Sequence, residues 1–271
     1  MIARCDHPVR LVARRELSST CFAIRLASEL PLEAIPGQFA MLACGNGLDP
    51  FLRRPFSLAG VSAGQHGTIV ELMVKEVGRA TTLLRHQALG NALQMLAPLG
   101  NGFDLTAVAQ RPFALVAGGI GLPPVLFAAE VLAATGTPFD LYLGAATASE
   151  LLEVERGRAA TTRSGGELIT TTDDGSAGEN GFVTSALLRR VTAGSQYGRV
   201  LACGPTPMLA ALADLGRARS LDVELSLEEP MACGMGVCLG CVVTTADRRR
   251  VPSCKEGPVF KARDLAERWW E

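Results

Sequence analysis

Four cysteines near the end of the 271-residue chain carry the strongest chemical signal in the sequence. Cys233, Cys238, Cys241 and Cys254 follow the spacing C-x4-C-x2-C-x12-C. This spacing is the plant-type pattern for a 2Fe-2S cluster held by four thiolates. The glycines among them allow tight backbone turns and bring N–H groups close to sulfur. A structural zinc site is the alternative, but zinc sites usually combine two short cysteine pairs, whereas Cys254 stands alone.

Two further motifs could hold phosphate groups. In RRPFSLAG, the guanidinium of Arg54 and the hydroxyl of Ser57 lie on one strand, where they could bind a pyrophosphate together. An arginine in solvent on a strand is the simpler alternative. VGRATTLL, residues 77–84, resembles a turn that leads into a helix N-terminus, a second natural seat for phosphate.

A glycine-rich turn and a later cysteine suggest a dinucleotide site. VAGGIGLPP places Gly118, Gly119 and Gly121 between a strand and a helix that begins near Pro123. Amide dipoles at such a helix start favour an anion, although strand–glycine–helix turns also arise for packing reasons. A later strand ends in CGP, beginning at Cys203, and ligands bind at such strand ends in parallel sheets. A buried structural cysteine is the alternative there.

The first part of the chain predicts a small antiparallel β-barrel. Short, partly alternating apolar runs are separated by glycine, proline, asparagine and serine. The expected strands are 9–17, 21–28, 38–44, 56–61 and 68–77, and a helix is expected at 80–89.

From about residue 111 the pattern changes to alternating strands and helices. Strands are expected at 112–119, 139–146, 166–175 and 198–205, and helices at 123–135, 149–157, 183–193 and 206–219. This alternation predicts a doubly wound parallel sheet. The chain is therefore expected to be a multidomain β plus α/β protein. The predicted domains are an antiparallel barrel at 1–105, the parallel-sheet domain at 106–220 and a small C-terminal cysteine domain at 221–271.

Composition excludes several classes of function. A net charge of −1 offers no electrostatic case for nucleic acid or an acidic membrane surface. No apolar run is long enough to span a bilayer, and the start of the chain lacks the apolar core of a secretory signal. We therefore expect a cytoplasmic protein that contacts no membrane, whose thiols stay reduced.

Together, these motifs resemble the ferredoxin reductase superfamily, and within it the PyrK family, the electron-transfer subunits of bacterial NAD-dependent dihydroorotate dehydrogenase. The resemblance rests on PGQF, RRPFS, PLGNGF, TTDDGSAGENGFVT and MACGMGVCLGC, which are distributed over essentially the whole chain. It implies FAD in the barrel domain, NAD in the parallel-sheet domain and the 2Fe-2S cluster in the C-terminal domain. It also implies a partner, the FMN-containing catalytic subunit, in a heterotetramer of two heterodimers. Electrons would pass from the FMN through the cluster and FAD to NAD⁺, in pyrimidine biosynthesis.

The resemblance also implies roles for individual residues. The implied FAD contacts are Arg54, Pro55, Phe56, Ser57, Met73, Val74, Lys75, Gly78, Thr81 and Thr82. The implied NAD contacts are Gly118, Gly119, Gly121, Pro123, Gly204 and Pro205. Cys203 would lie near the position of hydride transfer and is the predicted catalytic residue. The apolar segment 228–239 is the candidate surface for docking the partner.

The chain departs from the family pattern at two positions. Ala80 replaces a frequent glycine, and Ala146 replaces a frequent arginine, which weakens the case for NADP. Asp173 and Asp174 either favour the ribose hydroxyls of NAD or form a plain turn. The competing functions are a ferredoxin:NAD(P) oxidoreductase, an oxygenase reductase and, in another class, a zinc-stabilised binding module.

Overall fold

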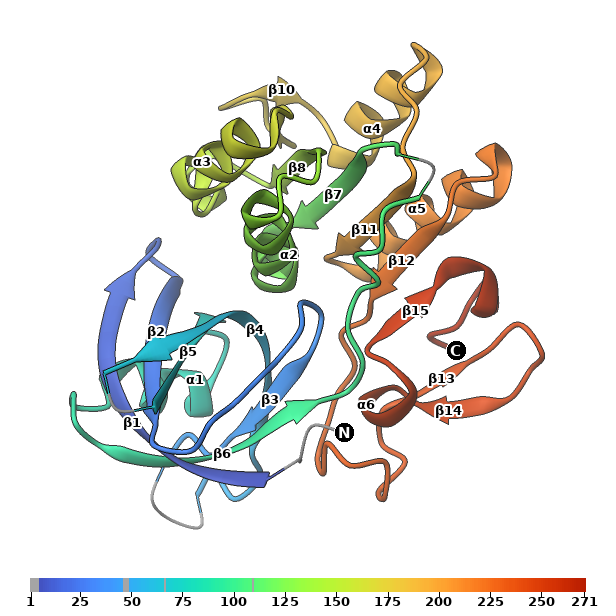
Figure 1. Cartoon of the computed structure of the whole chain (residues 1–271). Coiled ribbons are helices and arrows are strands. Elements are labelled where there is room, and N and C mark those ends of the chain that lie inside the picture. Colours follow the sequence, from blue (N-terminus) through green and yellow to red (C-terminus); the bar gives the residue numbers. More distant parts are fainter. Residues whose placement is uncertain (1–4, 46–48, 66, 109) are drawn as a thin grey trace.

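The computed structural model describes residues 5–45, 49–65, 67–108 and 110–271, and it consists of three packed units. Figure 1 shows a barrel, a sheet covered by helices and a smaller C-terminal unit that lies beside both. The first four residues of the predicted barrel domain lie outside the described residues. Within the described residues, no helix combines the length and apolar character needed to cross a membrane.

The first unit is a closed antiparallel barrel of six strands. Its strands are β1 (Cys5–Glu16), β2 (Cys21–Ser28), β3 (Phe39–Leu42), β4 (Arg54–Gly64), β5 (Gly67–Lys75) and β6 (Ala92–Leu99), closed in the order β1-β2-β5-β4-β3-β6. Apolar side chains such as Phe22, Ile24 and Leu72 fill the interior. Helix α1 (Arg79–His86) packs on the barrel through Ala80 and Leu84. Residues 92–99, for which the sequence pattern predicts no strand, complete the barrel as β6.

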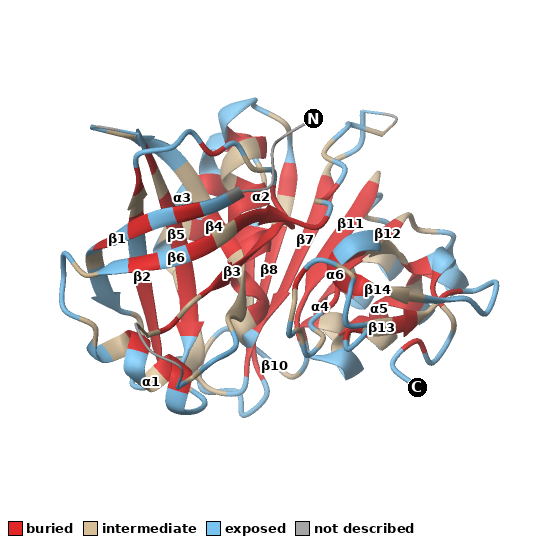
Figure 2. Cartoon of the chain, turned by 90° about the horizontal axis from the view of Figure 1, so that it is seen from below, coloured by how far each residue is buried: buried red, intermediate tan, exposed pale blue. Residues whose placement is uncertain are grey.

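The second unit is a seven-stranded sheet with helices on both faces. Its strands are β7 (Phe113–Gly118), β8 (Phe139–Ala145), β9 (Leu168–Thr172), β10 (Glu179–Asn180), β11 (Arg199–Cys203), β12 (Val223–Ser226) and β15 (Val259–Lys261), in the order β10-β9-β8-β7-β11-β12-β15. All neighbouring pairs are parallel except β12 with β15. Figure 2 shows the central strands buried along their length, as expected for a parallel sheet covered on both faces.

Four helices cover this sheet. They are α2 (Leu122–Ala134), α3 (Val154–Ser164), α4 (Val183–Thr192) and α5 (Thr206–Arg219). Leu115 and Leu141 face the apolar cluster that includes α2, whereas Val116 and Tyr142 face the cluster of α4 and α5. The expected helix at 149–157 is wrong in its first part, where only a short 3₁₀ turn, η2 (Ala148–Glu150), forms, and right from Val154, where α3 begins. Glu153 adopts a left-handed conformation with φ 55°, which prevents a continuous helix through this segment.

The third unit follows residue 226 and is built around the cysteine segment. It contains the hairpin β13 (Val242–Thr244) and β14 (Arg250–Pro252), the short helix α6 (Ser253–Glu256), the turn η3 (Ala262–Asp264) and the buried Trp269. Its last strand, β15, joins the parallel sheet next to β12. The domain boundaries at residues 105 and 220 remain predictions. Two strands of the seven-stranded sheet, β12 and β15, lie beyond residue 220.

Candidate functional site

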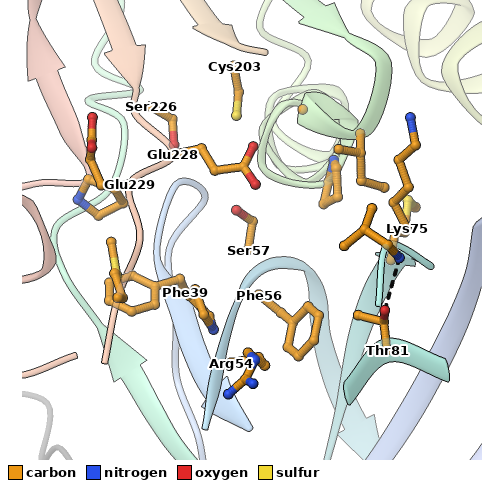
Figure 3. A pocket seen from close by; sticks show the side chains of 18 of the residues that line it. Phe39, Arg54, Phe56, Ser57, Lys75, Thr81, Cys203, Ser226, Glu228 and Glu229 are labelled. Carbon is orange, nitrogen blue, oxygen red and sulfur yellow. Dashed lines mark hydrogen bonds between the residues drawn. The ribbon is translucent and has the colours of Figure 1, made fainter. Parts of the chain in front are cut away.

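A cavity of about 430 Å³ lies where the three units meet (Figure 3). Its walls come from strands β3, β4 and β5, the start of α1, the turn before α2, the end of β11 and residues 226–231. The predicted site residues that line it are Arg54, Pro55, Phe56, Ser57, Met73, Lys75, Gly78, Thr81, Gly121, Pro123 and Cys203. The predicted residues that share this cavity are thus separated by up to 149 positions in the sequence, from Arg54 to Cys203.

The other predicted residues lie outside the lining. They are Val74, Thr82, Gly118, Gly119, Gly204 and Pro205. Val74 points into the barrel core, because side chains alternate along β5. The hydroxyl of Thr82 donates to Glu76 Oε1 at 2.7 Å.

The barrel wall of the cavity carries positive charge. Arg54 donates to the Leu52 carbonyl oxygen at 2.5 Å and has no ion-pair partner among the described residues. Lys75 and Arg79 line the same side, and Arg79 also pairs with Asp49 at 2.7 Å. A pyrophosphate suits such a wall, since guanidinium groups bind phosphate oxygens through two parallel hydrogen bonds.

The start of α1 is organised by Thr81. Its hydroxyl donates to the Gly78 carbonyl at 2.8 Å and accepts the backbone N–H groups of Val77 and Gly78. A Cβ at Gly78 would meet no atom within 4 Å, so the backbone there is open to a ligand in the cavity. Ala80 is buried in the barrel core beneath this turn.

The opposite wall depends on close contact between two strand ends. β7 and β11 are parallel neighbours, and the turn after β7 rests on the end of β11. A Cβ at Gly121 would lie 2.3 Å from the Cys203 carbonyl oxygen, so only glycine fits there. This contact brings Pro123 and Cys203 to the same side of the cavity, at the carboxyl ends of the strands.

Three other glycines of this region have different roles. Gly118 and Gly204 approach Met208, with which an added Cβ would clash. Gly119 has φ +53° and open space around it, so its need for glycine is conformational.

Cys203 is a neutral thiol at the edge of the cavity. Burial raises its pKa to about 12, opposed by contact with the Ser226 hydroxyl. A protonated thiol is a poor nucleophile, so the side chain contributes shape and low polarity rather than covalent chemistry.

Several lining residues were not named individually as site residues from the sequence, although some lie within the motifs 77–84, 116–124 and 228–239. They are Phe39, Val77, Arg79, Ala80, Ile120, Ser226, Leu227, Glu228, Glu229, Met231 and Pro258. Figure 3 shows Glu228 between Cys203 and Ser57, with its side chain directed into the cavity. Burial and the neighbouring Glu228 raise the pKa of Glu229. The lining residues within 226–231 could have been found from their position in the sequence, because this segment joins the end of strand β12 to the cysteine segment.

The four cysteines of the predicted cluster site differ in exposure. Cys241 and Cys254 are buried, Cys233 is half-buried and Cys238 is exposed. Backbone N–H groups point at their sulfur atoms. Gly236 donates to Cys254 Sγ at 3.0 Å, and Met235 donates to Cys233 Sγ at 3.4 Å.

The thiols pair two and two. Although partial burial opposes ionisation, the backbone N–H groups of Cys238 and Met235, together with the Cys238 thiol, lower the pKa of Cys233 to about 6. Burial, followed by contact with Cys241, raises the pKa of Cys254 to about 12. Two pairs of thiols suit a two-iron cluster, in which each iron takes two cysteine ligands.

The donor set bears on the choice between a cluster and a single zinc ion. Three glycines lie among the four cysteines, and the backbone N–H groups of Met235 and Gly236 donate to two of the sulfur atoms. The paired thiols and the sulfur-directed N–H groups therefore favour the cluster over zinc.

The cysteine loop and the cavity share a wall. Phe39 lines the cavity and also belongs to the apolar cluster that contains Cys241 and Cys254. Met231 makes the same connection, because it lines the cavity and packs against that cluster. A redox centre on these cysteines would lie one side chain away from a cofactor in the cavity.

The aspartates after β9 form a turn. Asp174 Oδ1 accepts the Ser176 backbone N–H at 2.9 Å and the Ser176 hydroxyl at 2.6 Å. Neither Asp173 nor Asp174 lines the cavity.

Comparisons with known families match two parts of the chain. A model described as the iron-sulfur cluster binding domain of dihydroorotate dehydrogenase B matches residues 228–266. A model described as an oxidoreductase NAD-binding domain matches residues 115–214.

Curated relatives match almost the entire chain. A protein of Lysinibacillus sphaericus (strain C3-41), named dihydroorotate dehydrogenase B (NAD(+)), electron transfer subunit, is 35% identical over 93% of this chain and 95% of its own. A Bacillus caldolyticus protein of the same name is 37% identical over 94% of this chain and 95% of its own. Among solved structures, an NADH-dependent reduced ferredoxin-NADP oxidoreductase has a TM-score of 0.82 at 26% identity, covering 96% of this chain and 90% of that one. This likeness agrees with the predicted barrel and parallel-sheet architecture.

Proposed function

Since the chain belongs to the family of electron transfer subunits of dihydroorotate dehydrogenase B (NAD(+)), we propose that it carries electrons from a dihydroorotate-oxidising catalytic subunit to NAD⁺. The family resemblance expected from the sequence motifs is confirmed. FAD, NAD and a 2Fe-2S cluster are its cofactors. The observation that carries the proposal is the shared wall between the four-cysteine loop and the cavity.

The protein positions its cofactors and excludes water around them. When bound, the flavin links one-electron exchange with the cluster to hydride exchange with NAD⁺. We assign Arg54, Ser57 and the turn at Gly78 to binding FAD phosphates and the flavin edge. Met73 and Lys75 form the strand wall beside them.

The nicotinamide side is assigned to the contact between the turn before α2 and the end of β11. Gly121 and Pro123 shape the entrance, and Cys203 supplies a neutral, buried surface. No side chain in the cavity has to act as a nucleophile. Glu228 and Glu229 make this wall acidic, opposite the basic wall that we assign to phosphate.

The cluster is assigned to Cys233, Cys238, Cys241 and Cys254. The backbone N–H groups of Met235 and Gly236 donate to two of these sulfur atoms. Such bonds stabilise added negative charge and orient the ligands. The zinc-stabilised module is therefore the weaker alternative.

We propose that the FMN-containing catalytic subunit docks over the exposed end of the cysteine loop. Met235, Val237 and Leu239 are exposed there, next to the exposed Cys238. Two such heterodimers would form a heterotetramer in the cytoplasm.

Reconstitution with a dihydroorotate dehydrogenase catalytic subunit tests this function. We expect dihydroorotate to reduce NAD⁺ only when both subunits are present and this chain contains FAD and the cluster. NADH formation is followed by its absorbance, and iron, sulfide and flavin are quantified. Absence of NADH formation with a fully loaded chain, together with rapid reduction of ferredoxin or an oxygenase, would favour the alternative reductases.

A further inference from the structure

Six charged side chains meet where the barrel contacts the helical face of the parallel sheet, outside the cavity. They are Arg15, Arg25, Glu71, Glu130, Glu153 and Arg156. The first three belong to barrel strands, and the last three belong to α2, to α3 or to the residue before α3. The three positive and three negative charges balance.

Arg156 connects the two units directly. Its Nε and Nη2 donate to the two carboxylate oxygens of Glu130 on α2, at 2.5 and 3.0 Å. Its Nη1 donates to Glu71 Oε1 on β5 at 2.6 Å. Arg25 donates to the other oxygen of Glu71 at 3.2 Å. One guanidinium therefore bridges a helix of the sheet unit and a strand of the barrel.

The bridge is largely shielded from water. The side chain of Glu71 is 9% exposed and that of Arg156 is 24% exposed. Ion pairs in such surroundings are screened less by salt than surface pairs. Glu153, which has a left-handed backbone, pairs with Arg15 of the barrel at 2.7 Å, giving a second link between the units.

Both elements joined by Arg156 continue into the cavity walls. Glu71, Met73 and Lys75 alternate along β5 and share one face of the strand, and Met73 and Lys75 line the cavity. On α2, Glu130 lies seven residues after Pro123, about 10 Å along the helix and on the same face. Arg156 therefore ties together two elements that each continue into a wall of the cavity.

We propose that Arg156 is a positioning residue that fixes the nicotinamide-side wall against the flavin-side wall of the cavity. The proposal rests on the proposed function, because it assigns one wall to each cofactor. Hydride transfer depends steeply on the alignment of donor and acceptor. Loss of the bridge should therefore slow hydride transfer more than it weakens NADH binding.

Arg156→Lys is the test variant. Lysine keeps the positive charge, but its single ammonium group cannot reproduce two contacts to Glu130 and a third to Glu71. Arg158→Lys is the matched control, because Arg158 lies on the same helix and is exposed, and its one ion pair among the described residues is with Glu155 at 3.5 Å. Glu71→Gln removes the negative charge of the barrel partner and one of its two acceptor oxygens, and it serves as an independent second variant.

The experiment uses the full chain loaded with FAD and cluster, and it has two readouts. In rapid mixing with NADH, we expect flavin reduction at saturating NADH to slow about tenfold or more in Arg156→Lys. The dissociation constant for NADH should stay within about twofold, since the contacts to NADH are retained. By hydrogen–deuterium exchange, amides at 71–75 and 121–126 should exchange faster in both test variants than in Arg158→Lys.

Unchanged exchange in both segments, or unchanged flavin reduction in both test variants, would overturn the proposal. Slower reduction that follows only from lost FAD would also overturn it. If NADH fails to reduce the flavin of the unaltered chain, the proposed function falls. The exchange measurement then still decides whether Arg156 joins the two walls.

Discussion

Ser253 carries a hydroxyl that the fold buries without a hydrogen-bond partner among the described residues. An unsatisfied buried hydroxyl costs about 1–3 kcal/mol. We expect Ser253→Ala to raise the melting temperature of the cofactor-loaded protein, because the substitution removes this cost. Ser28→Ala is the control. The buried Ser28 hydroxyl contacts His7 Nδ1 and donates to the Leu30 carbonyl, so its removal should lower the melting temperature.

A lower melting temperature for Ser253→Ala would contradict this expectation. It would show that the hydroxyl gains a partner when the adjacent Cys254 ligand is occupied. The comparison must be made at equal iron and flavin content, since bound cofactors themselves stabilise the folded state.

The buried thiol of Cys203 makes the stability of the protein depend on pH. Its pKa is raised from 9.0 to about 12 in the folded protein, with burial as the largest cause. The unfolded chain therefore releases this proton first. The stability contributed by the neutral thiol is complete below pH 9 and is lost as the pH rises towards 12.

We expect Cys203 to resist alkylation in the folded protein. At mildly alkaline pH, iodoacetamide should label it at least about tenfold more slowly than in the urea-unfolded chain, because the thiolate is the reactive form. Mass spectrometry of the peptide that contains Cys203 measures the rate. Equal rates in folded and unfolded protein would show that the thiol is accessible and ionised.

Among the elements, the contact between the start of α2 and the end of β11 leaves no room for a side chain at Gly121. Gly121→Ala would place a Cβ 2.3 Å from a backbone oxygen of Cys203 and force the two strand ends apart. We expect a loss of about 1–3 kcal/mol in the free energy of unfolding and weaker NADH binding. Thermal melting and an NADH titration measure the two effects.

Gly136→Ala, just beyond the other end of α2, is the control. It tests the effect of backbone strain at a glycine without displacing a neighbouring strand. Gly136 has φ +68°, and an added Cβ would meet no atom within 4 Å. This control should lower stability through its left-handed backbone while NADH binding stays unchanged. If Gly121→Ala also leaves NADH binding unchanged, the contact has no role in shaping the nicotinamide side.

The elements also show why parts of the structure could be predicted. Periodicity predicted β2, β7 and α5 because buried runs and amphipathic segments mark such elements directly. It placed the start of α3 too early, at residue 149, because Glu153 reverses the sign of φ where the pattern still resembles a helix. It overlooked β6, in which alternating exposure is interrupted near its end.

The candidate site also has a part that the sequence predicts and a part that it does not. The spacing of the cysteines predicts the ligand set, since it depends on local chain geometry. The cavity wall from Ser226 to Met231 was missed, because its side chains are ordinary until the fold brings them opposite Ser57. The bridge made by Arg156 was also missed, because it depends on contacts between distant segments.

At the scale of the whole molecule, the three units form a path from an exposed loop to a cavity. The cysteine loop presents Met235, Val237 and Leu239 at exposures of 51%, 78% and 59%. Its buried cysteines pack against Phe39, which reaches the cavity. Under the proposed function, electrons that enter at the loop reach the FAD that we assign to this cavity without crossing the parallel sheet.

Val237→Glu tests whether this loop receives the catalytic subunit. A charge placed in the centre of an apolar contact should weaken subunit binding about tenfold or more. Leu89→Glu is the matched control, because Leu89 is 60% exposed in the turn after α1. Calorimetry measures subunit affinity, and dihydroorotate-dependent NADH formation should fall in parallel for Val237→Glu alone. As a control, NADH must still reduce the flavin of both variants at the rate of the unaltered chain. If Val237→Glu binds the catalytic subunit with normal affinity, the docking surface lies elsewhere.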